Sequence, residues 1–143
     1  MAKVTGVDRV TRRLLALPDT VQREVSAALQ AAGEVIKAEA QVSITSGSRS
    51  GRPTRGTVRK QYIASAPGEP PTYDTEHLKS GIQVTQPEPL RVLVTSTARY
   101  SAALEFGTSK MAARPFMNPA ARAKRTEVTM IVRKAVDSAI RRG

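Results

Sequence analysis

The sequence predicts an α+β fold in which two long helices pack against a small mixed or antiparallel sheet of about three to four strands. Two observations support this prediction. Apolar residues recur at helical spacing over residues 19–44 and again after residue 118, and short alternating segments lie between these stretches. The 143 residues have room for one compact domain, so residues 1–143 are predicted to form a single unit.

The first long helix is predicted over residues 19–44. Asp19 and Thr20, which follow Pro18, are predicted to cap its start. Apolar residues spaced three or four positions apart line one face of this helix. They are Val21, Val25, Leu29, Ala32, Ile36 and Ala40.

A shorter helix is predicted before the long one. Val10, Leu14 and Leu17 then share one side, because they are three or four positions apart. Arg12 and Arg13 are expected to point outward.

Two loops are predicted in the middle of the chain. Residues 45–57 consist mainly of Ser, Gly, Arg, Pro and Thr, and a loop of this length in a compact domain is usually functional or disordered. Residues 64–73 contain three prolines and a glycine, which interrupt the hydrogen bonding of helices and strands. A short strand at 57–63 is predicted between the loop at 45–57, the basic loop, and the loop at 64–73, the Pro-rich loop.

The second half is predicted to contain a hairpin and further helices. In order, these are a helical turn capped by Asp74 or Thr75 and ending at Leu78, strands Ile82–Gln86 and Leu90–Thr95, a short helix at 99–106 and a last helix from Asn118. Residues 87–89 are predicted to join the strands, and Gly107 to end the short helix. Asn118 before Pro119 is typical of a helix N-cap and first helical position. The apolar face of the last helix is predicted to comprise Val128, Ile131, Val132, Ala135, Val136, Ala139 and Ile140.

The formal net charge of +11 is unevenly distributed. Residues 45–64 carry five basic side chains and no acidic one, whereas residues 110–143 carry nine basic and two acidic ones. Such a concentration indicates a surface that meets an anionic partner. A solvated face that keeps the protein soluble would give the same pattern, and the charge alone does not decide between the two interpretations.

The composition argues against enzymatic chemistry. The absence of cysteine excludes disulfides, thiolate metal sites and cysteine nucleophiles. The single histidine, His77, lies in a predicted capping turn, where a surface side chain is expected rather than a general base. The carboxylates are scattered over loops and helix ends instead of being gathered for a magnesium ion, so a metal-dependent nuclease is the weaker alternative. We therefore expect no catalysis, no metal and no cofactor.

The sequence also lacks the marks of membrane insertion. No uncharged apolar run approaches the ~18 residues that a membrane span needs. The first residues lack the apolar stretch of a signal peptide. We therefore expect no membrane partner.

Two stretches are specific enough to resemble a known family. The first runs from Ala64 to Thr75 and is followed by Leu78; the second joins residues 100–108, which end in Glu-Phe-Gly-Thr, to residues 113–120, Ala-Arg-Pro-Phe-Met-Asn-Pro-Ala. In this order and spacing they resemble the gene-product-ten-like tail-component family of long-tailed double-stranded DNA phages. The resemblance covers most of the chain.

The resemblance implies a structural virion protein at the head–tail junction, described as a neck or tail-completion protein. Copies are expected to form a homo-hexameric ring that joins the tail to the head connector and lets DNA pass. The implied partners are other copies of the chain, a head-completion or connector protein, a tail terminator or tail tube protein, and the passing double-stranded DNA. Assembly is expected in the host cytoplasm. Two alternatives stay open: a tail terminator ring that caps the tail tube, and a non-specific nucleic-acid-binding protein.

Candidate interface residues lie in the two loops, which have no core of their own. They are Arg49, Arg52, Arg55, Arg59, Pro67, Glu69, Pro70 and Pro71. We expect the basic side chains to pair with acidic faces of adjacent rings, because many phosphate contacts would hold the DNA back during ejection.

The second motif is expected to fix a corner between two helices rather than to bind a ligand. Gly107 is suited to the positive φ that ends a helix, Glu105 to backbone amides or to the guanidinium of Arg114, and Phe116 to burial beneath the last helix. The candidate structural residues are Glu105, Phe106, Gly107, Thr108, Arg114, Pro115, Phe116 and Pro119.

Overall fold

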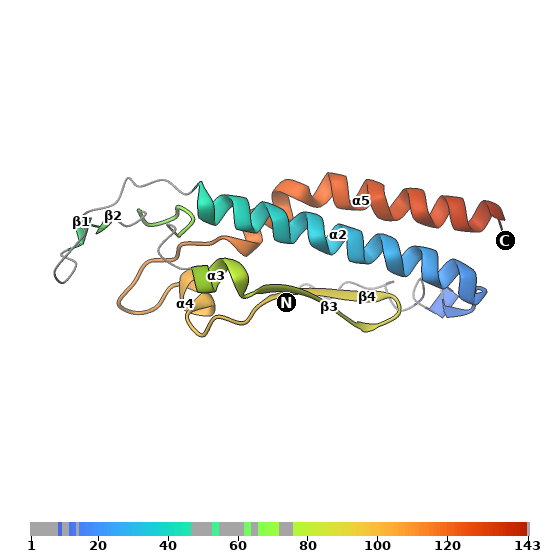
Figure 1. Ribbon diagram of the computed structural model, residues 1–143, viewed down its shortest axis with the longest axis horizontal. Coiled ribbons are helices and arrows are strands. Elements are labelled where there is room, and N and C mark those ends of the chain that lie inside the picture. The colour runs from blue at the N-terminus through green and yellow to red at the C-terminus, as the bar shows by residue number, and fades with distance from the viewer. Residues whose placement is uncertain are drawn as a thin grey trace.

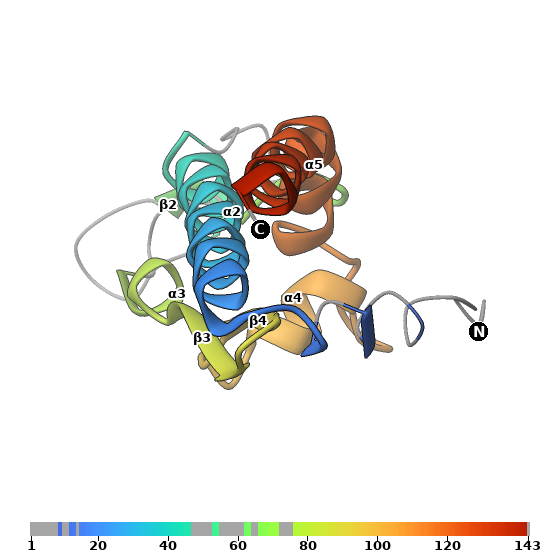
Figure 2. The same cartoon turned by 90° about the vertical axis from the view of Figure 1, so that its right-hand side faces the viewer.

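The computed structural model describes residues 9, 12–13, 15–46, 53–54, 62–63, 66–71 and 76–142. Two long helices lie side by side and run in opposite directions, and a β-hairpin packs along one of them (Figures 1 and 2). In chain order the elements are α2 (Asp19–Thr45), β1 (Pro53–Thr54), β2 (Tyr62–Ile63), α3 (Glu76–Ser80), β3 (Ile82–Glu88), β4 (Arg91–Ser96), α4 (Ser101–Phe106) and α5 (Met117–Arg142). The predicted α+β class is confirmed.

Helix α2 forms over nearly the predicted range, and its predicted apolar face is buried or half-buried throughout. The predicted cap is wrong. Asp19 is the first helical residue, Pro18 precedes it, and no side chain caps the helix. Instead the carbonyl of Pro18 accepts the N–H groups of Val21 at 2.9 Å and Gln22 at 3.2 Å. Pro18 has a φ of −53° and a ψ of 149°, so it lies just outside the helix, and its carbonyl begins the helical hydrogen bonding.

The sheet is smaller than predicted. The described residues form two separate two-stranded antiparallel sheets, β1–β2 and β3–β4, instead of one sheet of three to four strands. Strand β1 pairs with β2 from within the predicted loop at 45–57, most of which lies outside the described residues, as does most of the predicted strand at 57–63. Residues 45–57 contain almost no apolar residues, so their sequence offers no alternating apolar pattern for a strand of a larger sheet.

The β3–β4 hairpin turns later than predicted. Strand β3 continues through Pro87 to Glu88, so the chain reverses at Pro89 and Leu90 instead of over 87–89. The pairing is irregular between Thr85 and Glu88, where Pro87 has no N–H to donate. A register irregularity at this proline lets the strand pass through it.

Helix α2 lies directly on the hairpin at Gly33. A Cβ atom added there would lie 2.7 Å from Cγ1 of Val84 and 2.9 Å from Cγ1 of Val92. The predicted alternation of Leu90, Val92 and Val94 is confirmed, since all three are half-buried. The face of the hairpin that points away from α2 is exposed.

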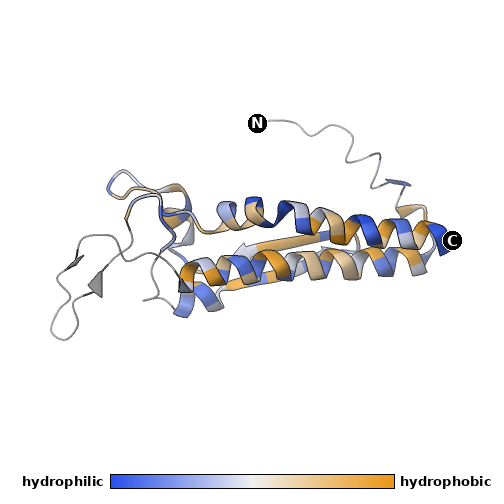
Figure 3. Ribbon diagram, turned by 90° about the horizontal axis from the view of Figure 1, so that it is seen from above, coloured by the Kyte–Doolittle hydropathy of each residue, from blue (hydrophilic) through white to orange (hydrophobic). Residues whose placement is uncertain are grey.

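The core consists of two clusters at opposite ends of the long helices. One comprises Ala40, Ile44, Leu78, Ile82, Phe116 and Ala120; the other comprises Val21, Val25 and Ala139. Hydrophobic positions alternate with hydrophilic ones along both long helices in Figure 3. The core is therefore aliphatic apart from one phenylalanine, as the composition requires.

Helix α5 differs from its prediction at both ends. It begins at Met117, so Asn118 lies inside the first turn and is not the N-cap. Ile140, predicted on the apolar face, is 58% exposed, because the packing partners on α2 end near Val21. The other predicted apolar positions of α5 are buried or half-buried.

The remaining predicted elements agree with the described residues. The short helix forms as α4 and is followed by Gly107, and the helical turn through Leu78 forms as α3. Residues 66–71 of the Pro-rich loop contain neither helix nor strand. In the N-terminal segment Leu17 packs on the core, and Arg12 and Arg13 are exposed. Four residues of these predictions lie outside the described residues: Val10, Leu14, Asp74 and Thr75.

Candidate functional site

The second sequence motif forms the corner between α4 and α5, and Glu105 holds the two helices together. Its Oε2 accepts the N–H groups of Phe116 at 2.9 Å and Met117 at 3.0 Å, and its Oε1 accepts the N–H of Asn118 at 2.8 Å. No helix carbonyl can satisfy these N–H groups, because they lie at the start of α5. The negative carboxylate is also favoured at the positive end of the helix dipole. The carboxylate of α4 is therefore the cap of α5.

Glu105 thus takes the first of its two expected partners. No ion pair joins it to Arg114 in the part of the chain that the structure describes. Instead the backbone N–H of Arg114 donates to the carbonyl of Leu104 at 2.6 Å, and its Nε is buried without a hydrogen-bond partner. The expected clamp of Arg114 on Glu105 is therefore wrong, because the three backbone N–H groups already occupy both carboxylate oxygens.

Gly107 makes the turn between the two helices possible. Its φ is 75° and its ψ is 177°, a conformation that residues other than glycine rarely adopt. Its N–H donates to the carbonyl of Ala103 at 2.8 Å and ends α4. The N–H of Thr108, which follows, donates to the carbonyl of Met111 at 2.8 Å. The positive φ expected of Gly107 is confirmed.

Replacing Gly107 by alanine is expected to lower the free energy of unfolding by about 1–3 kcal/mol. The new Cβ would lie 2.9 Å from both the backbone N of Ala113 and the backbone O of Met111. Gly68→Ala is the matched control, because Gly68 also has a positive φ, of 84°, but nothing lies within 4 Å of its Cβ position. Urea unfolding followed by circular dichroism measures both variants. If both variants lose the same free energy of unfolding, the contact of the new Cβ with the backbone of Met111 and Ala113 does not destabilise the protein.

The two phenylalanines of the chain have opposite environments. Phe116 is 1% exposed and packs in the cluster that contains Ile44, Leu78 and Ile82, so its predicted burial is confirmed. Phe106, at the end of α4, is 76% exposed. Sequence reasoning did not predict this exposure, because an aromatic residue in a short apolar helix indicates packing. Of the other motif residues, Pro115 is half-buried, and Thr108 and Pro119 are exposed.

The Pro-rich loop lies against the same corner. The N–H of Gly68 donates to the carbonyl of Ala113 at 2.9 Å. Within the loop, the N–H of Ala66 donates to Oε2 of Glu69 at 3.0 Å. Pro67 is exposed, Pro70 is half-buried and Pro71 is buried. The exposed part of this candidate interface is therefore narrower than the whole loop.

The other candidate interface residues, Arg49, Arg52, Arg55 and Arg59, lie outside the described residues. The structure therefore does not place them relative to the corner. Their contact with neighbouring subunits stays a prediction.

The outer face of α5 carries exposed positive charge. Lys124 is paired, at 3.2 Å from Glu127 and 3.7 Å from Glu39 of α2. The hydrogen bond and the charge of Glu127, together with the charge of Glu39, raise the pKa of Lys124 above its ordinary value. Five other basic residues are exposed and form no ion pair within the described ranges: Arg122, Arg125, Arg133, Lys134 and Arg141.

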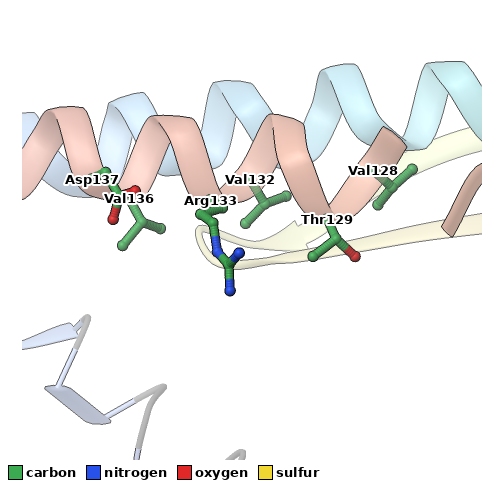
Figure 4. A pocket seen from close by; sticks show the side chains of 6 residues that line it. All are labelled: Val128, Thr129, Val132, Arg133, Val136 and Asp137. Carbon is green, nitrogen blue, oxygen red and sulfur yellow. The ribbon is translucent and has the colours of Figure 1, made fainter. Parts of the chain in front are cut away.

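A shallow groove of about 510 Å³ runs along one side of α5 (Figure 4). It is lined by Val128, Thr129, Val132, Arg133, Val136 and Asp137. These side chains supply an apolar floor and one charge of each sign, but no nucleophile next to a base. Among the described residues no three His, Asp or Glu side chains could hold a metal ion together, and His77 is exposed. No described helix is long and apolar enough to cross a membrane.

The model of the HK97-gp10-like family, described as a tail component of bacteriophage HK97, matches residues 8–107. No similar protein was found among curated proteins or among solved structures. The match ends at Gly107, so α5 and the second half of the corner motif lie beyond it. Because the matched region is more than half of the chain, the protein belongs to the HK97-gp10-like family of phage tail components.

Proposed function

We propose that the protein is a structural neck or tail-completion protein of the virion that forms a homo-hexameric ring at the head–tail junction. The ring joins the tail to the head connector and lets DNA pass through its centre. The observation that carries this proposal is the family match over residues 8–107, which makes the chain a phage tail component. The proposed role is structural and non-catalytic, as expected of a phage tail component.

The surface of the chain supports assembly through unlike faces. A closed ring requires heterologous interfaces, in which one surface of each subunit meets a different surface of the next. Large apolar side chains are exposed at separate places: Phe106 at the end of α4, Val42 on α2, and Met130 and Ile140 on α5. In the proposed ring, the unlike faces of the contact include some of these exposed side chains.

In this proposal the basic side chains contact neighbouring proteins. A head-completion or connector protein lies on one side of the ring and a tail terminator or tail tube protein on the other. The unpaired positive charges of α5 pair with acidic faces of these rings and not with the DNA, because many phosphate contacts would slow ejection. A ring structure in which the arginines of residues 45–57 project into the channel would overturn this assignment.

The mass of the purified protein in solution is the first test. We expect light scattering to find a species of six copies, about 92 kDa from the chain mass of 15.4 kDa, either alone or after addition of tail components. A stable monomer that ignores tail components would contradict the ring.

One alternative has a specific observation in its favour. The unpaired basic residues of α5 fit a non-specific nucleic-acid-binding protein, and such binding weakens steeply as salt increases. A monomer that binds duplex DNA with this salt dependence would replace the ring proposal. The second alternative, a tail terminator, is also a ring and is distinguished by labelling its position in the particle.

A further inference from the structure

Helix α5 carries a second groove, the Met130 groove, on a side that α2 leaves open. The groove measures about 450 Å³ and is lined by Ala123, Thr126, Glu127, Met130, Ile131 and Lys134. The side chain of Met130 is 52% exposed, although its thioether is apolar. A flexible and polarisable methionine adapts to the shape of a partner. The groove therefore offers an apolar contact at the surface of α5.

Positive charge continues from this groove toward the end of α5. Lys134 lines the groove, and Arg141 follows it by seven residues, so the two side chains lie in line about 10 Å apart along the helix axis. Arg133 lies beside them. All three are exposed and form no ion pair with another described residue. This basic line is suited to a partner that carries negative charge at the same spacing.

A second copy of the chain does not offer that negative charge. Among the described acidic residues, only Asp19 and Asp137 form neither an ion pair nor a hydrogen bond. Asp137 itself lies on α5 beside the basic line, and Asp19 is alone at the start of α2. Two more acidic residues, Asp8 and Asp74, lie outside the described residues. No described surface therefore presents a row of unpaired carboxylates to α5 of another copy.

The exposed apolar side chains favour a protein over nucleic acid as the partner. Ile140, next to Arg141, is 58% exposed, so apolar groups lie at both ends of the basic line. Phosphates gain nothing from contact with Met130 or Ile140, whereas methionine and arginine are enriched in protein interfaces. A helix can lie in such a groove, and carboxylates seven residues apart on that helix have the spacing of Lys134 and Arg141.

We propose that the Met130 groove and the basic line bind an acidic amphipathic helix of a different protein of the virion. This inference rests on the proposed ring, in which that protein is the neighbouring head or tail component. The apolar side of the bound helix contacts Met130, and its carboxylates pair with Lys134 and Arg141. The contact joins the ring to its neighbour, and the copies within the ring use other surfaces.

Fluorescence anisotropy with a synthetic peptide tests this surface. The probe is a labelled peptide with leucines three and four positions apart on one side of a helix and glutamates beside them. The control peptide has the same composition in shuffled order, so it has the same charge but no apolar side. We expect the amphipathic peptide to bind several-fold more tightly than the shuffled one. Equal binding of the two peptides would overturn the proposal.

Two substitutions locate the binding on α5. We expect Lys134→Gln and Met130→Ala each to weaken binding of the amphipathic peptide several-fold, because one removes a charge and the other an apolar contact. Lys110→Gln and Val42→Ala are the matched controls, since both residues are exposed and lie on other elements. Control variants that weaken the binding as much as the test variants would show that the peptide does not bind this groove.

A duplex DNA probe and light scattering distinguish the other occupants. If Lys134→Gln weakens binding of the duplex while Met130→Ala leaves peptide binding unchanged, the surface faces nucleic acid and the proposal is wrong. We expect the double variant with Met130→Ala and Lys134→Gln to form the six-copy species as the unsubstituted protein does. If only the unsubstituted protein forms it, the surface lies between copies, which overturns this inference and leaves the ring. A monomer that binds the amphipathic peptide selectively would contradict the ring and leave this surface in place.

Discussion

Replacing Phe116 by alanine is expected to lower the free energy of unfolding by about 3–5 kcal/mol, the usual range for removing a fully buried phenylalanine. The ring is 1% exposed and belongs to the cluster formed with Ile44 of α2, Leu78 of α3 and Ile82 of β3. The substitution therefore opens a cavity where helix α5 meets three other elements. The other members of this cluster among the described residues are aliphatic, so none of them supplies an aromatic ring to fill that cavity.

Phe106→Ala is the matched control, since it removes the same atoms from a side chain that is 76% exposed. We expect it to change the free energy of unfolding by less than about 0.5 kcal/mol, as is usual for surface substitutions. Urea unfolding of both variants measures the difference. A Phe116→Ala loss no larger than that of Phe106→Ala would show that the cluster does not hold α5 in place.

The two phenylalanines show how far the sequence could predict this corner. The roles of Gly107 and Phe116 followed from chemistry that is local in the chain: a glycine after a helix end, and an aromatic residue between prolines. For Glu105 the sequence left two partners open, backbone amides or Arg114, because the N–H groups that it accepts lie 11 to 13 residues later. The exposure of Phe106 could not be predicted, because it depends on which side of α4 faces the body of the protein. Contacts made later in the chain, such as the N–H of Arg114 that donates to the carbonyl of Leu104, are not contained in the pattern of a six-residue helix.

The sheet was mispredicted for a different reason. Alternation correctly predicted β3 and β4, since Leu90, Val92 and Val94 all face α2. The length of β3 was underestimated because Pro87 normally ends a strand, whereas here a register irregularity accommodates it. The sheet would have four strands only if the pair β1–β2 joined the pair β3–β4. Pairing between strands that are far apart in the sequence leaves no periodic pattern within the strands themselves.

The groove on α5 illustrates what periodicity leaves undecided. The spacing of Val128, Val132 and Val136 predicts a buried face, and α2 covers that face only in part. Periodicity shows that a row of residues is apolar, but it does not show how much of that row the neighbouring helix covers. The same pattern therefore predicted both the buried Ala139 and the exposed Ile140.

Replacing Glu105 by alanine is expected to lower the free energy of unfolding by about 2–4 kcal/mol, because charge-assisted hydrogen bonds contribute more than neutral ones and two of the donors that lose a partner are partly buried. Three N–H groups at the start of α5 lose their acceptor. Those of Phe116 and Met117 are only partly accessible to water, and they account for most of the loss. The N–H of Asn118 is exposed and can bind water instead.

Two further variants separate the cap from a general effect of charge. Glu105→Gln keeps one acceptor oxygen but points an amide N–H₂ at donors, so we expect a smaller loss than with alanine. Glu127→Ala removes a carboxylate from the surface of α5 that pairs with Lys124, and exposed pairs contribute about 0–1 kcal/mol. If Glu105→Ala cost no more than Glu127→Ala, the corner would depend on Phe116 alone. If the cap acts as proposed, Glu105→Ala and Phe116→Ala are non-additive, because both change how the first turn of α5 is held.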